Sequence, residues 1–139
     1  MKNFLKYLLI LPPALLCCIA VILSHQKKQP AADQIQAATE SDRSAWLMLQ
    51  GWNGELLYSR PVTVPEEFPE SYAEYVNLQL RLRLPLEQYA GRHGVVYTYQ
   101  LENSDLYAEL LTADGMLIGA QCYYPEEHIT RNMKGHKIT

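Results

Sequence analysis

The sequence predicts an α+β fold, in which an antiparallel sheet packs against one long and one short helix behind an N-terminal transmembrane helix. The strands are expected to be an edge strand followed by a three-stranded meander. Residues 94–101 alternate in polarity with the period of a strand. Asp114-Gly115 separates two apolar runs and is a strong hairpin signal. Residues 65–79 carry a helix start and then helical spacing, and a helix that covers one face of antiparallel strands gives this class.

A short helix and an edge strand come first in the expected domain. Thr39 and Asp42 stand three residues apart and resemble a capping box, which predicts a helix start. Gly51 is placed to end that helix in a left-handed conformation. Residues 56–64 then predict a strand. Because Pro61 lacks a backbone N–H, this strand is expected at a sheet edge or at a bulge.

The long helix is predicted to begin at residues 65–67, where a proline in the first turn precedes two glutamates at the positive end of the helix dipole. Side chains at helical spacing follow at Phe68, Tyr72, Tyr75, Val76 and Gln79. This aromatic stripe could stack on a sugar or a base, but stripes with this spacing line a core far more often. Residues 80–84 alternate like a strand, but Pro85 follows at once, which favours a frayed helix end.

The rest of the domain is predicted to be a packed turn and the meander. The turn covers residues 86–90 and is closed by Gly91. Gly119, in the last strand, allows a bulge or a close approach of another part of the chain. The three strands of the meander are expected at residues 94–101, 106–112 and 116–124.

An apolar run without a charge, from Tyr7 to Leu23, precedes the domain. Residues 4–23 together make about twenty, which is enough to cross a bilayer as a helix if Lys6 extends its amine to the interface. We therefore expect residues 4–23 to contact the membrane and residues 1–23 to form an uncleaved anchor.

Two alternatives remain for this segment, a cleaved signal peptide and a lipoprotein signal. Cleavage needs small residues such as Cys18 and Ala20, which would place the cut inside the apolar run. Leu16 before Cys17 matches a lipidation site poorly. A short basic head with a large C-terminal part indicates a single-pass protein of the cell membrane, with its soluble domain outside the cytoplasm.

The remaining chain divides into a polar linker at residues 24–40, a folded domain at residues 41–124 and a polar tail at residues 125–139, which is expected to be loosely ordered. All fifteen acidic residues, but only eight of the twelve Lys and Arg residues, follow Lys28. Residues 29–139 therefore carry a net charge of −7. An acidic domain without a basic stripe is a poor nucleic-acid binder.

No residue is predicted to be catalytic, to bind a cofactor or to ligate a metal. Glu126, Glu127, His128 and His136 could hold a metal on paper, but their spacing matches no zinc pattern. The sequence contains no glycine-rich phosphate loop and no G-x-S-x-G motif. Cys122, the one cysteine of the soluble part, is interpreted as a small buried residue in a strand.

Several short motifs follow one another in a distinctive order: Val62-Thr63-Val64-Pro65-Glu66-Glu67-Phe68, Tyr72, Tyr75, Leu78-Gln79, Leu86, Tyr89, Gly91, Tyr97-Thr98-Tyr99, Tyr107-Ala108, Leu110-Leu111, Asp114-Gly115 and Ile118-Gly119. In this order and spacing, residues 46–120 resemble the bacterial domain-of-unknown-function family 4830. The resemblance implies this architecture with a single N-terminal apolar segment, and it implies no activity and no site residues. Arg83, Pro85 and Ala120 depart from the family pattern, so the turn after the long helix is expected to differ.

Two classes of function fit these observations. The first is a membrane-tethered extracytoplasmic module at the bacterial cell surface, which would bind a protein or a cell-envelope component through a sheet face or edge. The second is a small envelope-associated enzyme, or an accessory domain of one, with His93 and the tyrosines as its candidates. A pocket that holds His93, Tyr97 and an acid would favour the enzyme, and a flat tyrosine-rich face would favour the binding module.

Overall fold

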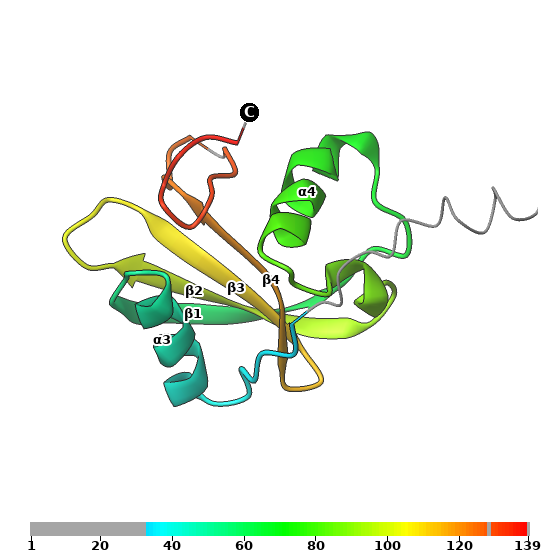
Figure 1. Ribbon diagram of the computed structural model, residues 1–139, viewed down its shortest axis with the longest axis horizontal. Helices are drawn as coiled ribbons and strands as arrows, with labels where there is room; N and C mark the ends of the chain where they lie inside the picture. Colours follow the sequence, from blue (N-terminus) through cyan, green and yellow to red (C-terminus); the bar gives the residue numbers. More distant parts are fainter. Residues whose placement is uncertain (1–32, 128, 139) are drawn as a thin grey trace, which may run out of the picture. The chain divides into compact units, whose positions relative to one another are not determined.

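A computed structural model describes residues 33–127 and 129–138 (Figure 1). Over this part the chain is an α+β domain with a four-stranded antiparallel sheet and two α-helices, which confirms the predicted class. The elements in chain order are α3 (Glu40–Leu49), β1 (Gly54–Thr63), the 3-10 helix η1 (Glu70–Tyr72), α4 (Ala73–Arg81), the 3-10 helix η2 (Leu86–Tyr89), β2 (His93–Leu101), β3 (Tyr107–Ala113) and β4 (Met116–Tyr123).

The predicted anchor, residues 1–23, lies outside the described residues, as does the linker up to residue 32. Within residues 33–127 and 129–138, no helix combines the length and the apolar character that crossing a bilayer requires.

The strands follow the order β1-β2-β3-β4 and neighbours are antiparallel throughout, so the edge strand and the meander both form as predicted. Pro61 lies in the edge strand β1, opposite Val95. An edge strand tolerates a residue that has no backbone N–H to donate. The irregularity in β1 falls elsewhere, between Leu56 and Tyr58.

The two α-helices cover opposite faces of the sheet (Figure 1). On one face, α3 packs Trp46 and Leu47 onto Tyr99 and its neighbours in a hydrophobic cluster. On the other face, α4 and the segment before it pack onto Val96 and Leu111 in a second cluster. The sheet is therefore covered on both faces rather than on one, and each helix buries its own apolar side.

The helix α3 begins where the capping box predicts. Thr39 Oγ1 accepts a hydrogen bond from the backbone N–H of Asp42 at 3.1 Å, and Asp42 Oδ2 accepts one from the N–H of Thr39 at 3.0 Å. Hydrogen bonds from the Thr39 backbone N–H and from the Thr39 side chain to the Asp42 carboxylate hold the pKa of Asp42 below its usual value. After the helix, Gly51 adopts a φ of +91°, as predicted, because a residue without a side chain enters this region at no steric cost.

Arg43 attaches α3 to the sheet although it is a charged residue in the core. Its Nε donates to Tyr99 Oη at 3.0 Å, and its Nη1 donates to the carbonyl of Ala37 at 3.0 Å. Its Nη2 pairs with the Glu40 carboxylate at 3.1 Å, and the guanidinium lies 3.6 Å from the centre of the Tyr97 ring. A buried charge is tolerated only when it is paired and hydrogen-bonded, and Arg43 satisfies both conditions.

The predicted long helix begins later than expected, so α4 is no longer than α3. Residues 65–69 are not helical; the 3-10 turn η1 follows them, and α4 spans nine residues. Pro69 is extended (φ −64°, ψ 159°), and a proline disfavours helical geometry in the residue before it, so no helix runs through this position. Residues 80–84 do not form a strand, as predicted, since α4 ends at Arg81 and Arg83 takes up a φ of +59°.

Gln79 attaches α4 to the outer edge of β4. Its side chain is buried; its Oε1 accepts a hydrogen bond from the N–H of Ala120 at 2.7 Å, and its Nε2 donates to the carbonyl of Ala120 at 2.9 Å. The amide thus pairs with β4 as a neighbouring strand would. Further along the same edge, Cys122 exchanges two backbone hydrogen bonds with Arg131, at 3.0 and 2.8 Å.

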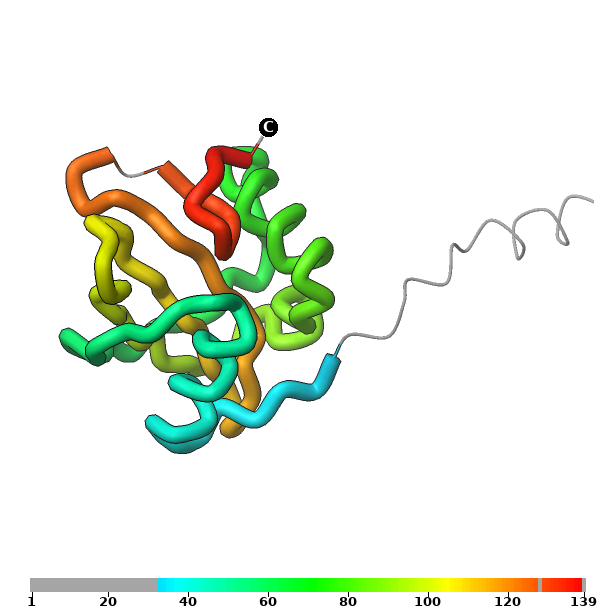
Figure 2. Tube along the Cα trace, turned by 60° about the vertical axis from the view of Figure 1, so that its left-hand side comes forward, coloured from blue at the N-terminus to red at the C-terminus, as the bar shows by residue number. Residues whose placement is uncertain are grey.

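Both ends of the described chain pack onto the sheet, beyond the limits of 41 and 124 expected for the domain. Ala37, expected in the linker, is buried, and the carbonyl of Ile35 accepts the N–H of Leu117 in β4 at 2.8 Å. Met133, expected in a loose tail, is also buried, and its carbonyl accepts a hydrogen bond from Trp52 Nε1 at 2.5 Å. Figure 2 shows the C-terminal segment (red) folded back beside β4.

Replacing Gln79 by leucine, a residue of similar size, is expected to lower the free energy of unfolding by about 2–4 kcal/mol. The reason is that the N–H and C=O of Ala120 would lose their partners and stay buried. Urea denaturation of the full chain in detergent, followed by tryptophan fluorescence, measures the change. Gln88→Leu, at an exposed position, is the control and should stay within about 0.5 kcal/mol of the parent. Equal stabilities of the two variants would contradict the role assigned to Gln79.

Candidate functional site

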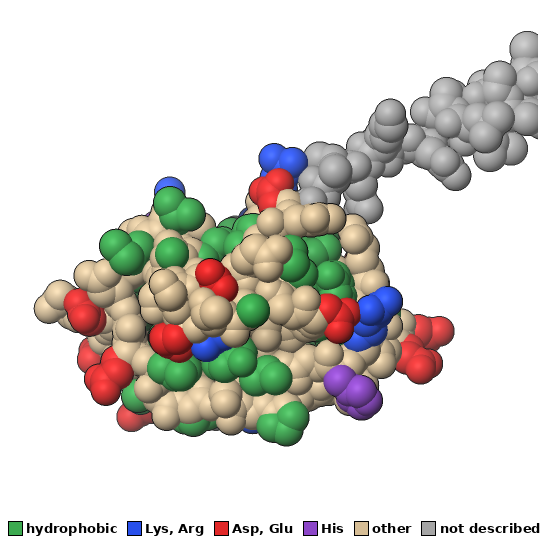
Figure 3. Space-filling view, turned by 90° about the horizontal axis from the view of Figure 1, so that it is seen from below, with side chains coloured by type: hydrophobic (Ala, Val, Ile, Leu, Met, Phe, Trp, Pro, Cys, Tyr) green, Lys and Arg blue, Asp and Glu red, His purple; other side chains and the backbone are tan. Residues whose placement is uncertain are grey.

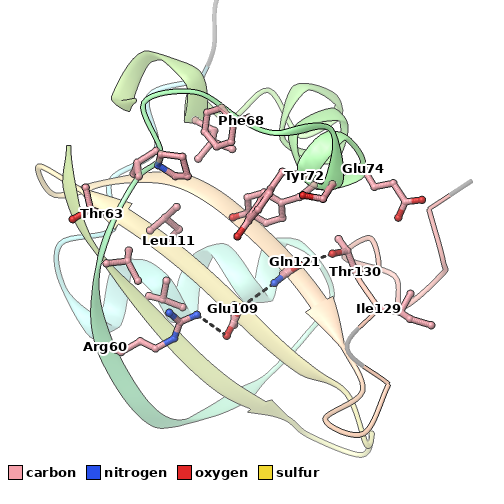
Figure 4. Close-up of a pocket in the computed structure, with 17 residues that line it drawn as sticks. Arg60, Thr63, Phe68, Tyr72, Glu74, Glu109, Leu111, Gln121, Ile129 and Thr130 are labelled. Atoms are coloured by element: carbon pink, nitrogen blue, oxygen red, sulfur yellow. Dashed lines mark hydrogen bonds and ion pairs between the residues drawn. The ribbon is translucent and has the colours of Figure 1, made fainter. Parts of the chain in front are cut away.

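A groove lies over the sheet face that carries α4, between the sheet and residues 62–75, with residues 129–130 at one end (Figure 4). Its cavity volume is about 490 Å³, and an adjoining hollow of about 380 Å³ continues it toward the end of β4. Together they form the sheet groove, whose size is that of a small-ligand site. The two hollows share Glu109, Gln121, Ile129 and Thr130.

The floor of the sheet groove is a row of polar side chains that crosses the strands. The register sets Tyr58, Glu109 and Gln121 in one row with the buried Thr98, one residue from each strand. Glu109 is central, because its Oε1 lies 3.5 Å from Arg60 Nη2 and its Oε2 accepts a hydrogen bond from Gln121 Nε2 at 2.9 Å (Figure 4). Thr130 extends the row by donating its hydroxyl to Gln121 Oε1 at 3.0 Å.

This polar row keeps hydrogen-bonding capacity for a ligand. A carboxylate offers about four acceptor positions, and Glu109 uses one toward Arg60 and one toward Gln121. The Arg60 side chain is 53% exposed, and a guanidinium carries five N–H donors. Beneath them, Thr98 Oγ1 is buried and has no hydrogen-bond partner among the described residues.

Aromatic side chains form the wall that faces this floor. Phe68 and Tyr75 pack on the second hydrophobic cluster, so the prediction that the aromatic stripe belongs to the core is confirmed for them. It is wrong for Tyr72, whose side chain is 47% exposed and lines the groove (Figure 4). Burial raises the pKa of Tyr75, and the nearby charge of Glu109 raises it further, so its hydroxyl stays protonated at neutral pH.

Three more tyrosines surround the adjoining hollow: Tyr58, Tyr107 and Tyr123. The rings of Tyr107 and Tyr123 lie on neighbouring strands with their centroids 5.9 Å apart, in an edge-to-face arrangement. Burial raises the pKa of Tyr123, and both the Glu109 charge and a hydrogen bond with Tyr58 act in the same direction. Neutral phenols combine an apolar ring with an O–H group, which suits ligands that have both kinds of surface.

The enzyme candidates of the sequence do not come together in the structure. His93 is exposed at the start of β2, with its Nδ1 3.2 Å from Thr63 Oγ1. Tyr97 lies beneath the Arg43 guanidinium, and neither His93 nor Tyr97 lines the sheet groove. His136 is exposed, and His25 and His128 lie outside the described residues. Across the part of the chain that the structure describes, His, Cys, Asp and Glu form no group of three that could hold a metal.

The polar residues of the groove were not singled out by their sequence pattern. One signal was available: in β3, which reads YAELLTA, Glu109 is the single charge among apolar neighbours. Its side chain is 17% exposed, so this charge is held largely inside the protein. Arg60, Gln121 and Thr130 carry no comparable signal, because each lies in a segment with several other polar residues.

No family model, no curated protein and no solved structure matches the chain. The resemblance to family 4830 therefore stays a prediction, and the geometry of the sheet groove carries the proposal that follows.

Cys122 lies in β4 and is fully buried, which confirms its interpretation as a small core residue. Its Sγ lies 3.8 Å from Met133 Sδ. Burial raises the pKa of the Cys122 thiol to about 12, so the reactive thiolate does not form at neutral pH.

A variant with Cys17→Ser and Cys18→Ser retains Cys122 as its remaining cysteine. In the folded protein near neutral pH, this thiol is expected to resist Ellman's reagent, because it is both buried and protonated. The same sample should release one equivalent of chromophore after denaturation, which provides the control. Rapid reaction of the folded protein would contradict the buried position of Cys122.

Proposed function

We propose that this chain is a membrane-tethered binding module outside the bacterial cytoplasm, and that its ligand occupies the sheet groove. The observation that carries the proposal is the groove itself, which is open, has an aromatic wall and presents convergent polar groups on its floor. Ligand sites commonly combine an apolar lining with a few placed polar groups. The resemblance to family 4830, which has no assigned activity, is compatible with this proposal and adds no site residue.

The arrangement of the floor favours binding without rearrangement. Glu109 and Gln121 project from paired strands of one sheet, and a hydrogen bond between their side chains fixes both. Groups that are already ordered lose little conformational entropy when they bind. A small domain can therefore bind a ligand with few contacts.

The tether is supported by the apolar run within residues 4–23, which is long enough to span a bilayer. The charge distribution argues against a nucleic acid as the ligand. Figure 3 shows acidic side chains spread over one side of the domain, with no basic stripe on that side. The alternative of a small envelope enzyme has no comparable support, because neither His93 nor Tyr97 lines the sheet groove.

A photo-crosslinking phenylalanine analogue in place of Tyr72 is expected to give covalent adducts with an envelope component when cells are irradiated, because this side chain lines the sheet groove. The same analogue in place of Leu49, which is 82% exposed on α3, is the matched control and should give few adducts. Gel shift and mass spectrometry of the full-length protein from its native membrane measure both. Equal labelling at the two positions, or none at Tyr72, would exclude the groove as the binding surface.

The tether itself has a separate test. The intact mass of the membrane-extracted protein is expected to include residues 1–23, because the apolar run lacks a good cleavage site. Protease added to the outside of spheroplasts should digest the domain, whereas a cytoplasmic marker protein stays intact. A mass without residues 1–23, or a domain protected until the cells are lysed, would overturn the tethered extracytoplasmic arrangement.

A further inference from the structure

The sheet groove is more complementary to one class of ligand than to the others. Resting on the proposed function, we infer that the sheet groove binds a neutral saccharide chain. Its floor, its wall and its charge each bear on this choice.

Charge selects against anionic ligands. Among the described residues that line the larger hollow, Arg60 is the one cation, and Glu74 and Glu109 are the anions. Arg60 and Glu109 already form an ion pair at 3.5 Å, which leaves Glu74 as the uncompensated charge. A phosphate, sulfate or polycarboxylate ligand would thus meet a site with a net negative charge, which disfavours anions.

The hydrogen-bonding groups of the floor suit hydroxyls. A hydroxyl both donates and accepts hydrogen bonds. It can therefore use the paired donors or acceptors that planar side-chain groups present in Arg60, Glu109 and Gln121. Neighbouring hydroxyls of a sugar ring can therefore bridge a carboxylate and an amide at the same time. Side chains on adjacent strands repeat at about 4.8 Å, so successive polar groups meet successive parts of an extended ligand.

The wall suits the other surface of a sugar. A pyranose ring has apolar C–H faces, and these faces stack on aromatic rings while the hydroxyls point outward to polar groups. Tyr72 offers such a face opposite Glu109, and Tyr58, Tyr107 and Tyr123 offer more around the adjoining hollow. Because the two hollows share their floor, the site suits a chain of rings rather than a single one.

An extended peptide fits the same groove less well. Peptides that bind to sheets pair their backbone with an open strand edge. The centre of the groove floor lies on β2 and β3, which are both paired on two sides, so their backbone groups are already used. A ligand on this face therefore meets side chains only, and those side chains suit hydroxyls.

The test measures binding of four probes to the full-length protein in nanodiscs by isothermal titration calorimetry. The probes are a tetrasaccharide of N-acetylglucosamine, a tetrasaccharide of glucose, a sulfated tetrasaccharide and an uncharged tetrapeptide. At least one neutral saccharide is expected to bind, and the sulfated one is expected to bind about tenfold more weakly or not at all. The two neutral probes distinguish an amino-sugar chain of the wall type from a plain glucose chain.

Variants connect the binding to the groove. Arg60→Gln and Tyr72→Ala are each expected to weaken saccharide binding about tenfold, by removing a charged donor and a stacking face. Arg92→Gln is the matched control, because Arg92 is 61% exposed and ion-paired with Asp114 at 2.7 Å but does not line the groove. Its affinity should stay within about twofold of the parent. All three variants should still unfold in one cooperative thermal transition, as the parent does, which separates lost binding from lost folding.

Tighter binding of the tetrapeptide or the sulfated probe than of either neutral saccharide would overturn the inference. So would an equal loss of affinity in Arg60→Gln and Arg92→Gln. If the photo-crosslinker in place of Tyr72 gives adducts while no saccharide binds, the saccharide inference fails and the groove remains a binding surface. If neither adducts nor binding appear, both the inference and the proposed function fail.

Discussion

The outer edge of β4 is the constraint on which the rest of the domain depends. An edge strand presents unpaired backbone groups that invite pairing with other chains. Here three separate segments meet those groups: the carbonyl of Ile35, the side-chain amide of Gln79 and the backbone of Arg131. They come from the N-terminal, central and C-terminal parts of the described chain. Because they converge on one strand, segments without any periodic pattern become part of the folded domain.

The same convergence creates the sheet groove. The amide of Gln79 holds α4 on β4, and the backbone pairing of Arg131 holds residues 129–130 near the same strand. The sheet face between them and β1 is left open, and Arg60 and Glu109 lie on it. The groove is therefore a consequence of how the edge of β4 is covered.

Features set by neighbouring residues were predictable from the sequence. The capping box at Thr39 and the edge position of Pro61 follow from local backbone chemistry, and both are confirmed. The prediction that the long helix begins at residues 65–67 was wrong, because Pro69 outweighs the favourable signals before it. The groove could not be predicted from the sequence, for a different reason. The contact between Arg60 and Glu109 exists only once the register of three strands is set, and a register depends on the whole sheet rather than on a local pattern.

Each α-helix is attached by a polar side chain, Arg43 in α3 and Gln79 in α4. Apolar contacts tolerate repacking, whereas a hydrogen bond keeps its geometry only within a few tenths of an ångström. Two bonds from one amide to one residue therefore determine how far α4 lies along β4. That position also sets the distance between the aromatic wall at Tyr72 and the polar floor at Glu109. A leucine in place of Gln79 could preserve the contact between helix and sheet and still lose this spacing, so we expect the buried amide to matter more for the shape of the groove than an apolar residue of the same volume would.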